Sequence, residues 1–144
     1  MNYLLDTCVI SELVAKKPNS QVLTWIDSLA DEHIFLSVLT VGEIQRGISK
    51  LPNSNRRTML VNWLETELLA RFSGRLLDLD VDVLLQWGEL VARLEGLGRP
   101  LPAIDSLFAA QALAFQLNFV TRNTKDFVDT GVNLVNPWQG EEIN

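Results

Sequence analysis

Residues 101–115 read LPAIDSLFAAQALAF, and this stretch determines how the rest of the chain is interpreted. It predicts a helix that is apolar on nearly every side, which is typical of a helix buried in a core. The exception is Asp105, a carboxylate in the first turn of that helix. Because aspartate is almost never fully buried without a partner, the rest of the sequence has to provide a partner for Asp105.

The composition indicates one domain, residues 1–144, with a sizeable core. Of the 144 residues, 47% are hydrophobic and 21% are charged, which is ordinary for a globular protein. No apolar run approaches the roughly 18 residues that span a bilayer. The opening MNYLLD has no basic lead-in or cleavage site, and the lone Cys8 excludes an internal disulfide, so we expect a cytoplasmic protein with no membrane partner.

The net charge of −6 is unfavourable for a nucleic-acid-binding protein, because phosphate binding depends on lysine and arginine. An acidic chain still meets this requirement if its acids are concentrated where a metal ion neutralises them. The positions of the acids along the chain are therefore decisive.

Short apolar segments alternate with amphipathic ones along the chain. The predicted strands cover residues 2–5, 33–37, 75–79, 117–121 and 132–135. The predicted helices cover about 9–14, from an N-cap at Ser20 to about 29, about 38–51, around 60–68, about 83–94, and 101–115. This alternation predicts an α/β fold in which helices cover both faces of a mostly parallel sheet.

Four acids and one amide lie near the ends of predicted elements. Asp6 ends the first strand, Glu43 lies in the first turns of the helix after the second strand, and Asp105 opens a helix. Asn123 and Asp126 follow the fourth strand. In doubly wound sheets, functional groups collect outside the carboxyl ends of the strands. We therefore expect several of these side chains to converge on one edge of the sheet.

Crowded carboxylates repel one another, and each is driven towards its neutral form. Hard divalent cations relieve this repulsion. Mg²⁺ binds one or two carboxylates and keeps several waters, and a pair of such ions activates a water and stabilises the leaving oxygen of a phosphodiester. The predicted partner of Asp105 is therefore a metal ion shared with Asp6 and other acids, and the dipole of its helix also favours the ionised form.

Most of these residues also have a structural interpretation. The structural alternatives are a helix cap at Asp105, a capping box of Thr40 with Glu43, and an N-cap at Asn123 with a first-turn acid at Asp126. Asp6 differs from them, because a charge at the end of an apolar first strand has little structural purpose.

Four segments together resemble a known family. They are LLDTCVISEL (4–13), SVLTVGEIQRGI (37–48), PAIDSLFAAQALAF (102–115) and FVTRNTKDF (119–127). They resemble the PIN domain and, more narrowly, the VapC and FitB toxins of bacterial toxin–antitoxin pairs, over essentially the whole chain. The resemblance implies a three-layer α/β/α sandwich around a central, mostly parallel sheet of four or five strands. It also implies a Mg²⁺- or Mn²⁺-dependent endoribonuclease toxin, silenced by a cognate antitoxin and usually homodimeric.

The same resemblance assigns roles to the acids and their neighbours. Asp6 and Asp105 are expected to be direct metal ligands and Glu43 a more distant one, with either Asn123 or Asp126 completing the site. The expected catalytic set is Asp6, Glu43, Asp105 and Asp126, and the expected supporting residues are Thr7, Ser11 and Thr121.

Basic residues flank the acids in the sequence. Arg46 and Lys50 share the helix face of Glu43, and Arg122 and Lys125 flank the end of the fourth strand. We expect these four to bind RNA phosphates, and the alternative is that Arg46 only pairs with Glu43 on a solvated helix face. Two further arginines, Arg56 and Arg57, are interpreted as plain surface residues.

The remaining candidates are interpreted as structural. His33, the only histidine, opens a predicted strand, which argues against a histidine general base, and Cys8 is taken as a small core residue. The tryptophans are mostly assigned to apolar helix faces in the core or at an interface, and Trp63 and Trp87 are the choices for an exposed apolar contact. They are Trp25, Trp63, Trp87 and Trp138.

Three rival functions remain for comparison. A haloacid-dehalogenase-like phosphatase needs a second acid two residues after Asp6, where Cys8 stands. A receiver-type phosphoacceptor would use Asp78 or Asp80, but leaves Asp105 without a role. The third is a weakly active or inactive PIN domain that acts as a regulatory binding module with its antitoxin on DNA.

Overall fold

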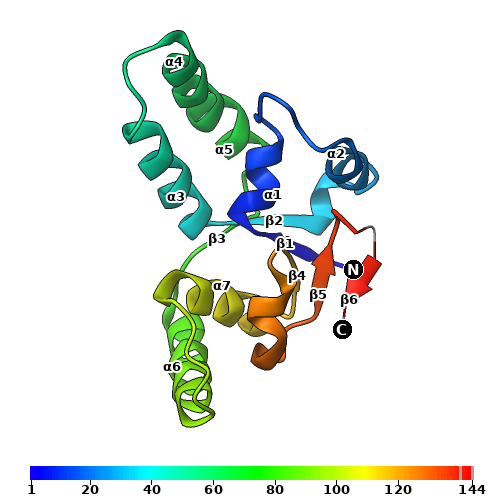
Figure 1. Cartoon of the computed structure of the whole chain (residues 1–144), viewed down its shortest axis with the longest axis vertical. Coiled ribbons are helices and arrows are strands. Elements are labelled where there is room, and N and C mark those ends of the chain that lie inside the picture. The colour runs from blue at the N-terminus through cyan, green and yellow to red at the C-terminus, as the bar shows by residue number, and fades with distance from the viewer. Residues whose placement is uncertain (140, 144) are drawn as a thin grey trace.

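The computed structural model describes residues 1–139 and 141–143, and a six-stranded sheet lies at its centre (Figure 1). The strand order is β3-β2-β1-β4-β5-β6. The strands are β1 Tyr3–Leu5, β2 Ile34–Ser37, β3 Leu76–Leu77, β4 Asn118–Val120, β5 Leu134–Asn136 and β6 Glu141–Ile143. The first five pair in parallel and β6 is antiparallel to β5, so the predicted mostly parallel sheet is confirmed.

Helices cover both faces of this sheet. The α-helices are α1 Thr7–Glu12, α2 Ser20–Asp27, α3 Val38–Ser49, α4 Asn55–Asn62, α5 Leu69–Arg71, α6 Val81–Gly96 and α7 Ala103–Ala114. Helices α1 to α5 lie on one side of the sheet and α6 and α7 on the other, which confirms the predicted three-layer α/β/α sandwich (Figure 1). No helix among the described residues has the combined length and apolar character needed to cross a bilayer.

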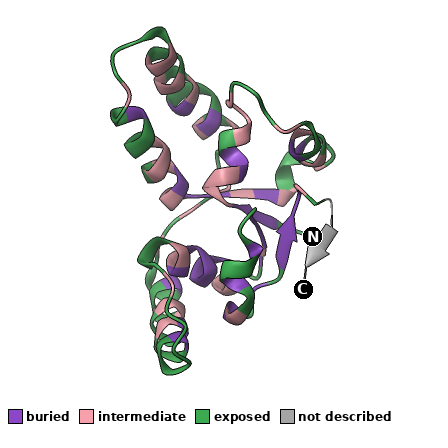
Figure 2. Ribbon diagram, in the orientation of Figure 1, coloured by how far each residue is buried: buried purple, intermediate pink, exposed green. Residues whose placement is uncertain are grey.

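Two apolar cores flank the sheet because successive strand side chains point to opposite faces. In β1, Tyr3 and Leu5 join the core beneath α1 to α5, while Leu4 joins the core beneath α6 and α7. Buried residues accordingly run along the strands and the inward helix faces (Figure 2). In the second core, the ring of Phe119 lies 5.6 Å from that of Phe108 and 4.9 Å from that of Phe127.

One predicted N-cap is wrong, and one structural alternative is excluded. Helix α2 is capped by Asn19, whose Oδ1 accepts hydrogen bonds from the backbone N–H groups of Gln21 and Val22, and Ser20 is its first residue. Both residue types are good N-caps, so the sequence alone did not separate them. Helix α3 is capped by Ser37, directly after β2, which removes the capping-box interpretation of Thr40.

Other segments differ from the prediction in type. The predicted helix around 60–68 contains a π-helical stretch, η2 (Trp63–Leu68), between α4 and α5. Strand β2 begins at Ile34, and its predicted first residue, His33, ends a 3₁₀ turn, η1 (Asp31–His33). Strand β6 was not predicted, because the sequence EEI offers no apolar run and no turn signal of its own.

Replacing Phe119 by alanine is expected to lower the free energy of unfolding by about 3–5 kcal/mol, because the cavity would lie between two other rings in a close-packed core. Phe119 is 0% exposed and Phe115 is 39% exposed, so Phe115→Ala is the matched control, with an expected loss below about 1 kcal/mol. Urea unfolding at equilibrium measures both. Equal losses in the two variants would contradict this description of the core.

Candidate active site

The acids identified in the sequence come together at the carboxyl edge of the sheet. Asp6 follows β1, Glu43 lies in α3 after β2, and Asp126 lies in the 3₁₀ segment η3 (Thr124–Thr130) after β4. Asp105 reaches the same edge from the first turn of α7. The pKa of Asp105 is raised by burial, and further by the charges of Asp6, Asp126 and Glu43. The four carboxylates therefore share one electrostatic environment.

Asp6 is held from both sides of its carboxylate. Its Oδ1 accepts a hydrogen bond from the backbone N–H of Thr7 at 2.7 Å, and its Oδ2 accepts one from the hydroxyl of buried Thr121 at 2.7 Å. Burial raises the pKa of Asp6, these hydrogen bonds lower it, and the charge of Glu43 raises it further. Because its rotamer is fixed in this way, Asp6 presents its oxygens in a defined direction.

A second contact of Thr7 orients Glu43. The Thr7 hydroxyl donates to Glu43 Oε1 at 2.6 Å, and it lies 3.0 Å from the hydroxyl of Thr40. Because the hydroxyl hydrogen of Thr7 is used in the bond to Glu43, the Thr40 hydroxyl donates to the hydroxyl oxygen of Thr7. The side chain of Ser11, the other predicted supporting residue of α1, forms no hydrogen bond to an acid among the described residues, so its expected contact is absent.

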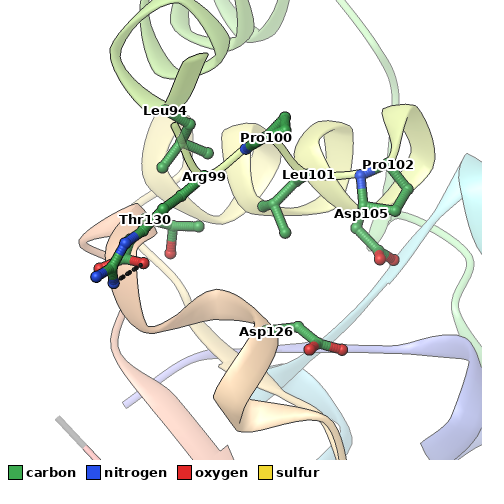
Figure 3. A pocket seen from close by; sticks show the side chains of 9 residues that line it. Leu94, Arg99, Pro100, Leu101, Pro102, Asp105, Asp126 and Thr130 are labelled. Carbon is green, nitrogen blue, oxygen red and sulfur yellow. Dashed lines mark hydrogen bonds and ion pairs between the residues drawn. The ribbon is translucent and has the colours of Figure 1, made fainter. Parts of the chain in front are cut away.

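Asp105 does not cap its helix. The N-cap position of α7 is Pro102, and no side chain caps that end, so the structural alternative for Asp105 is wrong. Asp105 and Asp126 line the same cavity, at one end of it (Figure 3). Asn123 occupies the N-cap position of η3 without a side-chain capping bond, and it does not line that cavity. The structure thus brings Asp126, rather than Asn123, next to Asp105.

None of the four acids has a cationic partner in the part of the chain that the structure describes. The ion pairs found there are His33–Glu32, Arg71–Asp31 and Arg99–Asp129. The alternative pairing of Arg46 with Glu43 is therefore not formed. The negative charge at the carboxyl edge has to be neutralised by protons or by a cation from solution.

The donor set suits a hard, partly hydrated cation. Within residues 1–139, no group of three or more histidine, cysteine, aspartate or glutamate side chains is arranged to hold an ion on its own. Such a closed arrangement is what a structural site requires, whereas Mg²⁺ binds through one or two carboxylates, several waters and substrate phosphates. Carboxylate oxygens such as those of Asp6 and Asp105 fit Mg²⁺ or Mn²⁺ in this open mode.

The predicted phosphate-binding residues are all exposed. Arg46 is exposed on α3, Lys50 is exposed at its C-cap, and Lys125 is exposed in η3. Arg122 is exposed as well, and its guanidinium lies 5.4 Å from the ring centre of Trp138. The indole therefore restricts where Arg122 can reach, which favours binding with little loss of side-chain entropy.

Two residues interpreted as surface or helix-face residues, Arg56 and Trp138, have other roles or positions. Arg56 is partly buried and donates to the backbone carbonyl of Val14, so it is not a plain surface residue, whereas Arg57 contacts Asn53 on the surface. Trp138 follows β5 in a turn and is not on a helix face.

The residues set aside from catalysis lie away from it or are chemically unsuited. The Nδ1 atom of His33 lies 2.9 Å from Asn2 Oδ1 at the opposite edge of the sheet. Burial, followed by the charge of Asp6, raises the pKa of Cys8 to about 12, so this thiol is neutral at physiological pH. Asp80 caps α6 by accepting a hydrogen bond from the backbone N–H of Val83, which is a structural role.

A model of the PIN domain family matches residues 3–133. The chain belongs to the PIN domain family. It is 38% identical to the VapC ribonuclease Y4jK of Sinorhizobium fredii over 136 residues, covering 94% of this chain and 97% of the relative. It is 36% identical to toxin FitB of Neisseria gonorrhoeae over 135 residues, covering 94% of this chain and 97% of FitB.

A solved structure of FitAB bound to an IR36 DNA fragment contains a chain with the same fold as this PIN domain. The TM-score is 0.92 at 34% identity, and the alignment covers 99% of each chain. The helical layers and the carboxyl edge described above are therefore those of a PIN domain over the whole length compared.

One residue of the site escaped the sequence interpretation. Thr40 is 0% exposed and orients Thr7, which lies 33 positions earlier. Its place in the pattern T-x-x-E suggested a helix cap, and no local signal indicates a tertiary contact of this kind.

Asp105→Asn is expected to stabilise the protein at pH 7 in EDTA, raising Tm by roughly 1–3 °C, a small shift because the carboxyl is partly exposed and screened. Because folding raises the pKa of Asp105, the protonated carboxyl favours the folded state. This contribution to stability is complete below the unfolded-state pKa and is lost as the pH rises through the folded-state pKa. The gain should therefore vanish in acid, where the parent carboxyl is protonated.

Thermal melts at neutral and acidic pH measure this difference. Glu32→Gln is the control, because the Glu32 side chain is 78% exposed and lies at the opposite edge of the sheet. A destabilised Asp105→Asn protein at neutral pH without metal would contradict mutual repulsion among the acids.

Proposed function

We propose that this chain is a divalent-metal-dependent endoribonuclease and the toxin of a toxin–antitoxin pair. The observation that carries the proposal is the group of four carboxylates without a cationic partner among the described residues, at the carboxyl edge of a PIN domain. The names of its relatives, a VapC ribonuclease and a toxin, support the same activity.

Asp6 and Asp105 are the proposed direct metal ligands, with Glu43 more distant. We assign the fourth place to Asp126, because it lines the same cavity as Asp105 and contributes to raising the pKa of Asp105. When bound, Mg²⁺ or Mn²⁺ supplies charge neutralisation and Lewis acidity to a phosphodiester. No histidine is available at this edge, since His33 lies at the opposite one.

The other side chains hold the acids and the RNA in place. The Thr121 hydroxyl and the Thr7 backbone N–H fix the orientation of the Asp6 carboxylate, and the Thr7 hydroxyl fixes that of Glu43. The proposed phosphate contacts are Arg46, Lys50, Arg122 and Lys125. They lie on or close in sequence to elements that carry acids of the site, so they offer phosphate contacts to RNA in a chain whose net charge is −6.

The proposed partners are RNA, a cognate antitoxin and a second copy of the chain in a homodimer. The likeness to a chain in FitAB bound to DNA supports a protein partner and a role for the complex on DNA. We infer that residues 1–144 form one PIN domain, and that it acts in the cytoplasm, where its RNA substrate is found.

Asp6→Asn is expected to lower RNA cleavage more than about 100-fold, because a neutral amide replaces a carboxylate that ligates the cation. The isosteric amide keeps one oxygen to accept from the Thr7 backbone N–H, and its NH2 group donates to the Thr121 hydroxyl oxygen, so circular dichroism should match the parent. The assay follows a labelled RNA in Mg²⁺ on protein freed of contaminating nucleases, with Glu32→Gln as the control of equal charge change. Cleavage by Asp6→Asn at the parent rate would refute the site.

Calorimetric titration with Mn²⁺ separates the nuclease from the binding-module alternative. The nuclease proposal expects binding by the parent and a loss of affinity of roughly 10- to 100-fold or more in Asp6→Asn. A parent protein that binds no Mn²⁺ would favour a PIN domain that acts only through its antitoxin and DNA.

A further inference from the structure

A cavity of about 300 Å³ adjoins the proposed metal site at Asp105 and Asp126 (Figure 3). It lies between the α6–α7 connection and η3, with Asp105 and Asp126 at one end and Arg99 with Asp129 at the other. The residues between the two ends are mostly apolar, and they are Leu94, Pro100, Leu101, Pro102 and Thr130. An anionic end, an apolar wall and a cationic group thus follow one another in space.

The walls of this cavity are fixed by the backbone. Gly98 follows the C-cap of α6 with a φ of +69°, a left-handed conformation that glycine adopts without strain, and the N–H of Arg99 then donates to Leu94 O at 2.9 Å. Pro100 and Pro102 fix their own φ angles. On the opposite side, the Arg93 guanidinium donates to the backbone carbonyls of Asp129 and Thr130 at 2.9 and 3.1 Å, which ties η3 to α6.

Arg99 is the cationic side chain that lines this cavity, and the fold depends little on its charge. Its side chain is 65% exposed, and within the described part of the chain its one ion pair joins Nη1 to Asp129 Oδ2 at 3.0 Å. Ion pairs this exposed contribute little to stability, so Arg99 can exchange Asp129 for another anion at low cost. A guanidinium binds phosphate oxygens with two parallel hydrogen bonds, which makes phosphate the favoured exchange partner.

We propose that this cavity is a subsite for one nucleotide of single-stranded RNA, the nucleotide next to the scissile phosphate. Its sugar and base pack on Leu101 and Pro102, and its outer phosphate binds Arg99. The volume lies at the lower end of the roughly 300–1,000 Å³ of small-ligand pockets, which fits one nucleotide and no longer piece. The proposal rests on the proposed ribonuclease function, which supplies the scissile phosphate at the Asp105 end.

The test compares three variants in steady-state cleavage of a short single-stranded RNA in Mg²⁺. Arg99→Gln is expected to raise KM roughly 5- to 20-fold with little change in kcat, and to reduce the salt slope of kcat/KM by about 1. Asp129→Asn is expected to lower KM about two-fold, because it removes a negative charge and frees the guanidinium. Arg71→Gln is the matched control, since it removes the other exposed Arg–Asp ion pair.

A merely structural role for Arg99 predicts a different pattern, in which Arg99→Gln and Asp129→Asn weaken RNA binding equally because each breaks the same ion pair. That result, or an Arg99→Gln KM equal to that of Arg71→Gln, would overturn the subsite. Mn²⁺ affinity measured by calorimetry should stay at the parent value in Arg99→Gln. If the parent cleaves no RNA, the proposed function fails, and fluorescence anisotropy of labelled RNA then decides the subsite by the same comparison of variants.

Discussion

Repulsion among carboxylates at one edge of a parallel sheet is the constraint on which the rest of the site depends. Burial and the charges of its neighbours raise the pKa of Asp105, and no lysine, arginine or histidine forms an ion pair with any of the four acids among the described residues. A fold that only needed to be stable would not concentrate charge in this way. The arrangement is favourable once a divalent cation is bound, and this links an unfavourable local feature to function.

The scaffold keeps these acids in place with neutral groups. Thr121 and the Thr7 amide hold Asp6, and Thr40 holds Thr7, which in turn holds Glu43. Hydroxyl and amide donors fix the direction of an oxygen without cancelling its charge, whereas a lysine or arginine would compete with the cation. The two arginines near the cavity differ in a related way. Arg93 donates to backbone carbonyls of η3 and holds η3 against α6, whereas Arg99 remains available to a ligand.

Local patterns in the sequence predicted the layers of the fold and the edge where the acids meet, because strand ends and helix starts depend on neighbouring residues. Contacts between distant residues were not predictable in this way. Thr40 in α3 matches a capping pattern, but it packs against Thr7 on another helix. The choice of Asp126 over Asn123 depends on how η3 folds back towards α7, and the antiparallel strand Glu141–Ile143 is too short and too charged to be recognised.

The most direct measurement is a crystal structure with Mn²⁺, in which anomalous scattering locates the ion independently of its ligands. The account predicts a peak in contact with both Asp6 and Asp105, with Glu43 further away and waters completing the coordination. A well-ordered structure in saturating Mn²⁺ that shows no peak between Asp6 and Asp105, or a peak only at another surface, would contradict it.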